Sequence, residues 1–371
     1  MRLFRGIDWL MLGSAVVLSL GGLSSMYGFV AASPFALRQT IWLILGIVVF
    51  FLFSVMDFRF LRRTGVVVAL YAGAVALLAL LFVLGVAVNG ARGWFDLGTF
   101  AVQPADLAEF AIIVVLAKYF SRRHVEIAHF RHIIVSGIYA LIICALLFLQ
   151  PDFGGALIIA AVWFGMVLVA GIPVRRLALL LGVGAVAVSL LWTFGLHEYQ
   201  QNRILTFVHP LADISGAGYN AFQSTVAVGS GGVFGKGIGY GTQSRLQFLP
   251  EHETDFIFAS FSEEWGLMGT LILLSVFGTL IYRLVANARA GATNFETLFA
   301  LGAATLFMTH AVINGGMNVG LLPVTGVPFS FMSYGGSHLL TGYAILGIVN
   351  AMRRYGRAAR EDEQHEMVGI G

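Results

Sequence analysis

The sequence predicts an all-α polytopic membrane protein with ten transmembrane helices and a large extracytoplasmic loop between the seventh and eighth. Of its 371 residues, 58% are hydrophobic and only 11% are charged, whereas a soluble domain carries about 25% charged residues. Apolar runs of the length that spans a bilayer recur along the chain. Lipid forces backbone groups to pair within a segment, so these runs are helices, and the alternation of a membrane β-barrel is absent. Soluble, disordered and disulfide-scaffold proteins are excluded.

Ten runs have the length and apolarity of a span, and the fourth is the most polar because Asp106, Glu109 and Lys118 lie in it. The runs are 9–26, 40–56, 65–88, 105–120, 132–149, 153–171, 177–195, 266–286, 295–321 and 328–350. They divide the chain into helices one to seven (1–195), the extracytoplasmic loop (196–265), helices eight to ten (266–350) and a polar cytoplasmic tail with little structure (351–371). We expect aromatic residues to pack the loop into a cap with short helices.

Lys and Arg concentrate in the loops of one membrane side, including both ends of the chain, such as Arg2, Arg5 and Arg353. The positive-inside rule therefore predicts that both termini are cytoplasmic. The formal net charge of +3 follows from this pattern and does not indicate nucleic-acid binding. Cys144 is the single cysteine, so an intrachain disulfide is impossible. The first run lacks a small-residue cleavage site and is expected to be a span.

A glycine-rich stretch, 229–241, occupies the loop and contains Lys236. Glycine lets backbone N–H groups converge into a concavity that binds anions, and Lys236 adds a positive charge. A nucleotide P-loop is excluded, because the motif requires glycine where Ser230 stands and Ser or Thr where Gly237 stands. An anion site and a tight turn beside a helix both remain open.

Asp255 precedes the apolar run that begins at Phe256. Either Thr254 or Asp255 has the residue type of a helix N-cap, which is the structural interpretation. Ionisable groups at membrane depth are costly and mark functional sites. Asp255 also lies in the loop that contains Arg203 and Lys236. Such a carboxylate can take a proton from an attacking hydroxyl while cations stabilise a departing diphosphate.

Other polar residues within the apolar runs are few. Asp152 follows Pro151 in a tight outward turn and is interpreted as a turn former. Asp106 and Glu109 share a helix face, so their charges repel or face a wet cavity. His310 and Asn314 are four apart, and we expect hydrogen bonds between helices there. No His, Cys and Glu cluster has the sequence spacing of a structural metal site, and none is assigned.

These motifs together resemble the SEDS family (shape, elongation, division and sporulation), whose members include RodA and FtsW. The resemblance covers essentially the whole chain. It rests on 103–104, 150–154, 218–220, 223–224, 229–232, 235–237, 241–244, 249–251, 254–258 and 333–337. The modest length and short tail are more similar to RodA than to FtsW.

The resemblance implies a peptidoglycan glycosyltransferase that polymerises lipid II in the inner membrane and works with a class B penicillin-binding protein. Asp255 matches the family's essential aspartate, Lys236 its Gly-Lys-Gly lysine, and Arg203 the arginine before the first loop motif. The substrate-binding residues expected from the motifs are Arg203, Lys236, Gln243, Ser244, Glu251, Asp152, Ser337 and Asp106. Further expected partners are the growing glycan strand, elongation-complex proteins and membrane lipid.

No cofactor is firmly implied, and a divalent cation, Mg²⁺ or Mn²⁺, is an open alternative. Asp255 is then either the base or a metal ligand, because a helix N-terminus favours the ionised carboxylate. Three other functions stay open at this point: a lipid II flippase, an FtsW-like division polymerase and a non-catalytic scaffold. Transporters place coupling groups near the midplane in broken helices, whereas the polar cluster here lies on the outer face.

Two positions depart from the family pattern. The family reads Gln-Pro-Ser-Glu followed by Lys at the fourth span, where this chain has Asp106 and then Glu109. The family's Gly-Gly-Ser-Ser ends here in Ser337 and His338. The first change removes the local ion pair, and the second adds a titratable group.

Overall fold

The computed structural model describes residues 6–27, 34–88, 91–96, 98, 101–122, 130–190, 192–193, 201, 205, 207 and 217–368. Each of the ten predicted runs contains a helix. These helices are α1 (Trp9–Tyr27), α2 (Pro34–Val55), α3 (Thr64–Leu84), α4 (Pro104–Ser121), α5 (Phe130–Leu149), α6 (Phe153–Val169), α7 (Val174–Leu190), α11 (Ile257–Arg289), α12 (Asn294–Asn318) and α13 (Gly336–Val368).

Six helices within the described ranges are long and apolar enough to cross a membrane: α1, α2, α3, α5, α11 and α12. The helix α6 is apolar but shorter. The all-α membrane class is therefore confirmed, and the count of ten spans stays a prediction.

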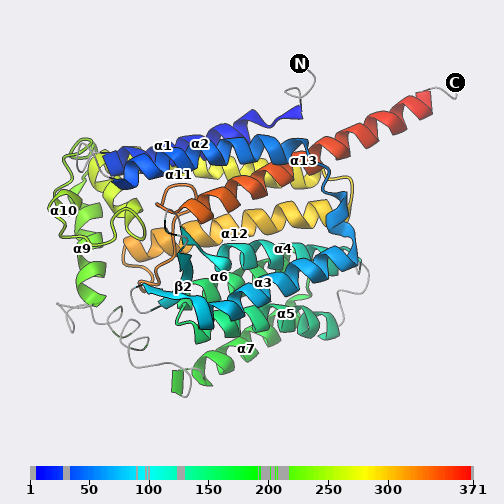
Figure 1. The fold of residues 1–371 in the computed structure, drawn as a ribbon, viewed down its shortest axis with the longest axis horizontal. Coiled ribbons are helices and arrows are strands. Elements are labelled where there is room, and N and C mark those ends of the chain that lie inside the picture. Colours follow the sequence, from blue (N-terminus) through cyan, green and yellow to red (C-terminus); the bar gives the residue numbers. More distant parts are fainter. Residues whose placement is uncertain are drawn as a thin grey trace.

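The helices form a bundle that separates the two ends of the molecule (Figure 1). Helix α2 packs along α13 and α1 along α11, while α12 contacts α11, α4 and α6. Both chain ends lie at one end of the bundle, and α9 (Ala217–Ser230) and α10 (Thr242–Arg245) lie at the other. Both helices lie within the segment predicted as the loop, whereas 194–200 and 208–216 lie outside the described residues.

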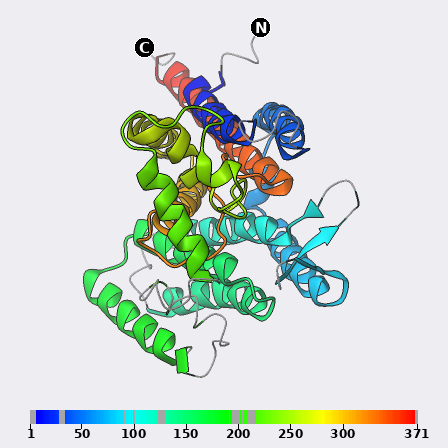
Figure 2. The same ribbon diagram turned by 90° about the vertical axis from the view of Figure 1, so that its left-hand side faces the viewer.

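Two predictions are wrong in the type of secondary structure that they assign. The helix of the third predicted run ends at Leu84, because the backbone of Gly85 is extended. The Val-rich segment after Gly85 favours a strand. A three-stranded antiparallel sheet follows, with order β1 (Val86–Val88), β2 (Ala91–Asp96) and β3 (Ala101–Val102). It projects from the bundle in Figure 2. The tail is helical, because α13 continues to Val368. Ala, Arg and Glu are strong helix formers, and extending an existing helix requires no new nucleation.

Glycines bring α2 and α13 close together. A β carbon on Gly46 would lie 2.6 Å from the Tyr343 ring, and one on Gly347 would lie 2.9 Å from the carbonyl oxygen of Phe50. Small residues let membrane helices approach to backbone contact, where dispersion rather than the hydrophobic effect stabilises the pair. This contact fixes the position of α13, whose first turn carries part of the buried polar cluster described below.

Helix α11 begins nine residues earlier than the predicted eighth span and is kinked at Gly266, which has φ 66° and ψ −169°. The β carbon of any other residue at Gly266 would lie 2.2 Å from the amide nitrogen of Gly235. The kink therefore requires glycine for both its conformation and its space. It turns the first part of α11 toward α9.

Candidate active site

Asp255 lies on a tight turn that leads into α11. Backbone N–H groups of Thr254 and Phe256 donate to the carbonyl of Glu251 at 3.2 and 3.1 Å, and Glu251 adopts a positive φ of 52°. The N-cap of α11 is Phe256, and no side chain caps the helix. The structural interpretation of Thr254 or Asp255 as N-cap is therefore wrong. The chain turns one residue later than expected, which leaves the half-buried Asp255 on the turn.

Two asparagines of α12 hold this turn by its backbone. The side-chain amides of Asn314 and Asn318 donate to the carbonyl of Asp255 at 2.9 and 3.1 Å. Asn314 also donates to the carbonyl of Val327, and Asn318 accepts from the amide of Ala259 at 3.0 Å. Asn314 does hydrogen-bond outside its own helix as expected, but its partners Asp255 and Val327 lie in non-helical segments rather than on a second helix. This network fixes the backbone and so restricts where the Asp255 carboxylate can lie.

The segment before α13 braces the same turn from another side. The hydroxyl of Ser333 donates to the carbonyl of Thr254 at 2.6 Å, and the amide of Tyr334 donates to the carbonyl of Glu253 at 2.8 Å. The Asp255 carbonyl is hydrogen-bonded to α12, and the two residues before it are hydrogen-bonded to this segment. The Asp255 carboxylate is therefore held on a preorganised support.

Lys236 does not stand as an isolated cation. Its ammonium lies 2.6 Å from a carboxylate oxygen of Glu263, whose side chain is completely buried. The same oxygen accepts from the amide and hydroxyl of Thr242 at 2.8 and 3.0 Å and from the amide of Gln243 at 3.2 Å. Lys236 also donates to Ser230 at 2.8 Å. Glu263 is thus an internal anion at the first turn of α10.

The glycine-rich stretch uses its amides internally as well. Lys236 and Gly237 donate to the carbonyls of Glu263 and Glu264, each at 3.0 Å, and Gly239 donates to the Glu264 carboxylate at 2.9 Å. Of the two alternatives that the sequence leaves open for this stretch, these bonds favour the tight turn beside a helix over an open anion-binding concavity. It satisfies the carbonyls that the kink of α11 leaves unpaired, because a kink breaks the helical ladder.

A second polar group lies inside the bundle between α4, α12 and α13. Asp106 accepts a hydrogen bond from the Ser337 hydroxyl at 2.6 Å and lies 3.1 Å from Nδ1 of His338. Glu109 lies 3.4 Å from Nε2 of His310. The structure thus brings together the predicted residues Asp106 and Ser337, and it adds Glu109, His310 and His338. Sequence reasoning missed these three as a cluster because they come from three distant segments.

Of the remaining predicted residues, Asp152 lies close enough to Asp106 and Glu109 for its carboxylate to interact with theirs electrostatically. The Asp152 carboxylate accepts from the amide of Gly155 at 2.8 Å and caps α6, which confirms its interpretation as a turn former. Glu251 is exposed on the Asp255 turn, and Ser244 lies in α10. Arg203 lies outside the described residues.

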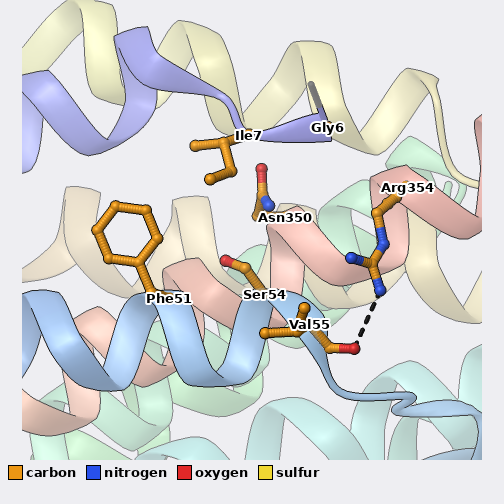
Figure 3. A pocket seen from close by; sticks show the side chains of 7 residues that line it. All are labelled: Gly6, Ile7, Phe51, Ser54, Val55, Asn350 and Arg354. Atoms are coloured by element: carbon orange, nitrogen blue, oxygen red, sulfur yellow. Dashed lines mark hydrogen bonds between the residues drawn. The ribbon is translucent and has the colours of Figure 1, made fainter. Parts of the chain in front are cut away.

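A cavity of about 330 Å³ opens at the opposite end of the molecule (Figure 3). It is lined by Gly6, Ile7, Phe51, Ser54, Val55, Asn350 and Arg354. Arg354 donates to the Val55 carbonyl at 3.0 Å across its mouth. This cavity lies near the chain ends and is not the Asp255 site.

Comparisons with known proteins decide the family. The model of the FtsW, RodA and SpoVE family, described as cell cycle proteins, matches residues 2–358. The chain belongs to the SEDS family. "Peptidoglycan glycosyltransferase MrdB" of Escherichia coli strain K12 is 36% identical over 286 residues, covering 77% of each chain.

Solved SEDS structures have the same fold. A chain of a peptidoglycan synthase complex, described as coordinating polymerization and crosslinking, matches with a TM-score of 0.80 and 32% identity, over 94% of this chain and 98% of that one. The rod shape determining protein RodA of Thermus thermophilus matches with a TM-score of 0.70 and 32% identity, over 94% and 96%. The SEDS resemblance drawn from the motifs is confirmed.

Proposed function

We propose that this chain is a peptidoglycan glycosyltransferase that polymerises lipid II into glycan strands at the outer face of the inner membrane, with both termini cytoplasmic. The observation that carries the proposal is full-length membership of the SEDS family together with 36% identity to a curated peptidoglycan glycosyltransferase. The preorganised Asp255 turn at the end of the bundle opposite the termini is consistent with an extracytoplasmic reaction.

In the proposed reaction, lipid II is the acceptor and the growing strand is the donor. The sugar 4-hydroxyl oxygen of lipid II attacks the anomeric carbon of the donor as that carbon's bond to undecaprenyl diphosphate breaks, which inverts the centre. Asp255 takes the hydroxyl proton, a role worth about 10²–10⁴-fold in rate. Arg203 and Lys236 are proposed to face the departing diphosphate. Gln243, Ser244 and Glu251 are proposed to line the entry.

Asp255 also suits a divalent cation that is shared with substrate. Mg²⁺ is commonly held by one or two carboxylates and substrate phosphates. In the part of the chain that the structure describes, the single group of three metal-ligating side chains does not include Asp255. A cation bound there would supply charge stabilisation to the diphosphate, with Asp255 as its protein ligand. Loss of polymer with EDTA and its recovery with Mg²⁺ or Mn²⁺ tests this role.

The decisive experiment follows glycan formation from fluorescent lipid II by the purified chain, with Asp255→Asn as the variant. We expect a loss of at least about 10²-fold in rate, because Asn keeps the size but cannot accept the proton. Asp57→Asn is the matched control, since Asp57 is exposed with 59% of its side chain accessible. Long glycan made by Asp255→Asn at the wild-type rate would remove Asp255 from the reaction.

The same assay separates polymerase from flippase, because polymerisation in detergent needs no second compartment. The synthase complex at a TM-score of 0.80 supports a class B penicillin-binding protein as the partner. The family model spans both RodA and FtsW, and the likeness to the solved RodA of Thermus thermophilus supports the elongation role. Restoration of rod shape, rather than division, in a RodA-depleted cell tests that assignment.

A further inference from the structure

Two carboxylates in the bundle interior have no strong cation beside them. Asp106 and Glu109 are 4% and 5% exposed. Among the described residues, their ion-pair partners are histidines alone: His338 for Asp106 and His310 for Glu109. Burying unpaired carboxylates is costly, and a Lys or Arg partner is the common solution. A cation bound at this position would supply the missing positive charge.

The spacing of the side chains fits a metal ion. Ligand atoms of Glu109, His310 and His338 all lie within 4.8 Å of one another. Nε2 of His310 is buried, makes no hydrogen bond and lies 3.4 Å from a Glu109 oxygen. Two ligands on one tetrahedral zinc ion, at about 2.0–2.1 Å each, are separated by roughly 3.4 Å. The imidazole centroids are 5.0 Å apart, close to the roughly 5 Å that the same geometry requires.

The other nitrogen of each ring is already occupied. Nδ1 of His338 lies 3.1 Å from Asp106, which Ser337 also contacts, and Nδ1 of His310 lies 2.9 Å from the Ser330 hydroxyl. Metal-binding histidines typically use one nitrogen for the metal and the other for a carboxylate or another polar partner, which fixes the tautomer. Both rings are thus oriented with Nε2 left for a ligand.

We propose that Glu109, His310 and His338 bind one zinc ion, with Asp106 and Ser330 orienting the two imidazoles. The ion balances the two carboxylates, whereas protonating both histidines would place two positive charges on stacked rings. Two imidazoles and one carboxylate are a zinc ligand set whose fourth position is taken by water, while Mg²⁺ and Ca²⁺ prefer oxygen ligands. This site is separate from any cation at Asp255.

The zinc ion would join three helices beneath the Asp255 turn. Its ligands come from α4, α12 and α13, and His310 lies one helical turn from Asn314, which holds the Asp255 carbonyl. We assign it a structural role, because the ligands are buried or nearly so and tie elements far apart in sequence. The proposal rests on these residues alone and does not depend on glycosyltransferase activity.

The test is the metal content of the full chain, purified through a tag without histidine and analysed by mass spectrometry of the elements. We expect about one zinc per chain in the wild type. His338→Gln and His310→Gln should each lower the content at least tenfold. His132→Gln is the control, because His132 is also buried, at 4% exposure, but bonds to Tyr119 away from the cluster. This variant should keep its zinc.

Cobalt substitution covers the case in which a variant fails to fold. The wild-type chain loaded with Co²⁺ should show the visible absorption bands of a tetrahedral site, and X-ray absorption should count two imidazoles on the metal. Zinc-free wild-type protein that takes up no Co²⁺, or zinc retained by both histidine variants, would overturn the proposal. These readouts need no lipid II, so their failure is distinct from failure of the proposed activity.

Discussion

Two buried glutamates of this protein solve the same problem differently. Glu263, in the part of α11 before its kink, is surrounded by an ammonium, two backbone amides and a hydroxyl. Glu109, inside the bundle, has a histidine at 3.4 Å that does not complete a hydrogen bond. Groups of the protein itself neutralise the Glu263 carboxylate, whereas the Glu109 carboxylate has an incomplete set of partners and fits a bound cation. The hydrogen-bond and ion-pair partners of a buried carboxylate therefore indicate whether a ligand is bound there, because an incomplete set of partners points to a ligand.

The largest effect should follow from breaking the Glu263 group. Lys236→Met removes the ammonium and leaves a buried carboxylate without its cation, which costs about 3–5 kcal/mol in comparable pairs. We expect a clear fall in the melting temperature measured by thermal unfolding in detergent. Arg245→Met, which removes an exposed cation of α10, should leave it unchanged. An unchanged melting temperature would mean that Lys236 does not stabilise the buried Glu263 carboxylate, whatever its role toward the diphosphate.

The glycine-rich stretch offers a second comparison. Gly235 has φ 79°, and its β carbon would lie 2.1 Å from the Glu264 carbonyl oxygen, while Gly237 has φ 95° and only a side-chain contact at 3.4 Å. Gly237→Ala should cost about 1–2 kcal/mol for the left-handed backbone. Gly235→Ala adds a backbone clash and should lower the melting temperature further. Equal losses would mean that the stretch does not pack against the kink.

A smaller effect, on zinc affinity, is expected from a substitution beside the proposed ligands. Ser330→Ala removes the hydroxyl beside Nδ1 of His310 without touching a proposed ligand. Loss of such an orienting partner typically weakens metal affinity about 10–100-fold, which competition with a chromophoric zinc chelator measures. Ser275→Ala, on the exposed face of α11, is the control. Full affinity in Ser330→Ala would remove Ser330 from the site.

The smallest effect concerns Asp8, another buried carboxylate, which lies before α1. Burial alone would raise its pKa, but Arg283, Asn287 and Arg353 outweigh burial and hold the pKa below its usual value. Because the folded-state pKa is depressed, the stabilisation is complete above the unfolded value of about 3.9 and is lost as pH falls through the folded pKa. Melting temperature should decline below about pH 4, and Asp8→Asn should flatten that decline. A variant with the same slope would assign the loss to other groups.

Much of the fold could be predicted from apolar run length, because a bilayer requires about 20 apolar residues and internally paired backbone. All ten predicted runs contain helices. The wrong predictions lie in segments whose secondary structure cannot be inferred from hydropathy. The strand Val86–Val88 is as apolar as a helix end, and the helical tail is polar. Length and polarity alone do not distinguish these cases.

The candidate site was predictable in parts. Asp255 could be singled out because a carboxylate at a membrane boundary is costly and stands out in an apolar sequence. Its support by Asn314, Asn318 and Ser333 could not, since these residues are ordinary polar positions until the fold places them. The internal partner of Lys236 was equally hidden, because Glu263 is 27 residues away.

The sequence by itself determined that this chain lives in a membrane, which helices it forms and which family it belongs to. Those properties depend on composition and local motifs, which are read residue by residue. Only the tertiary structure decided that the glycine-rich stretch holds the chain's own glutamate, and that Glu109, His310 and His338 converge. Both are contacts between segments distant in the chain, and such contacts are set by helix packing.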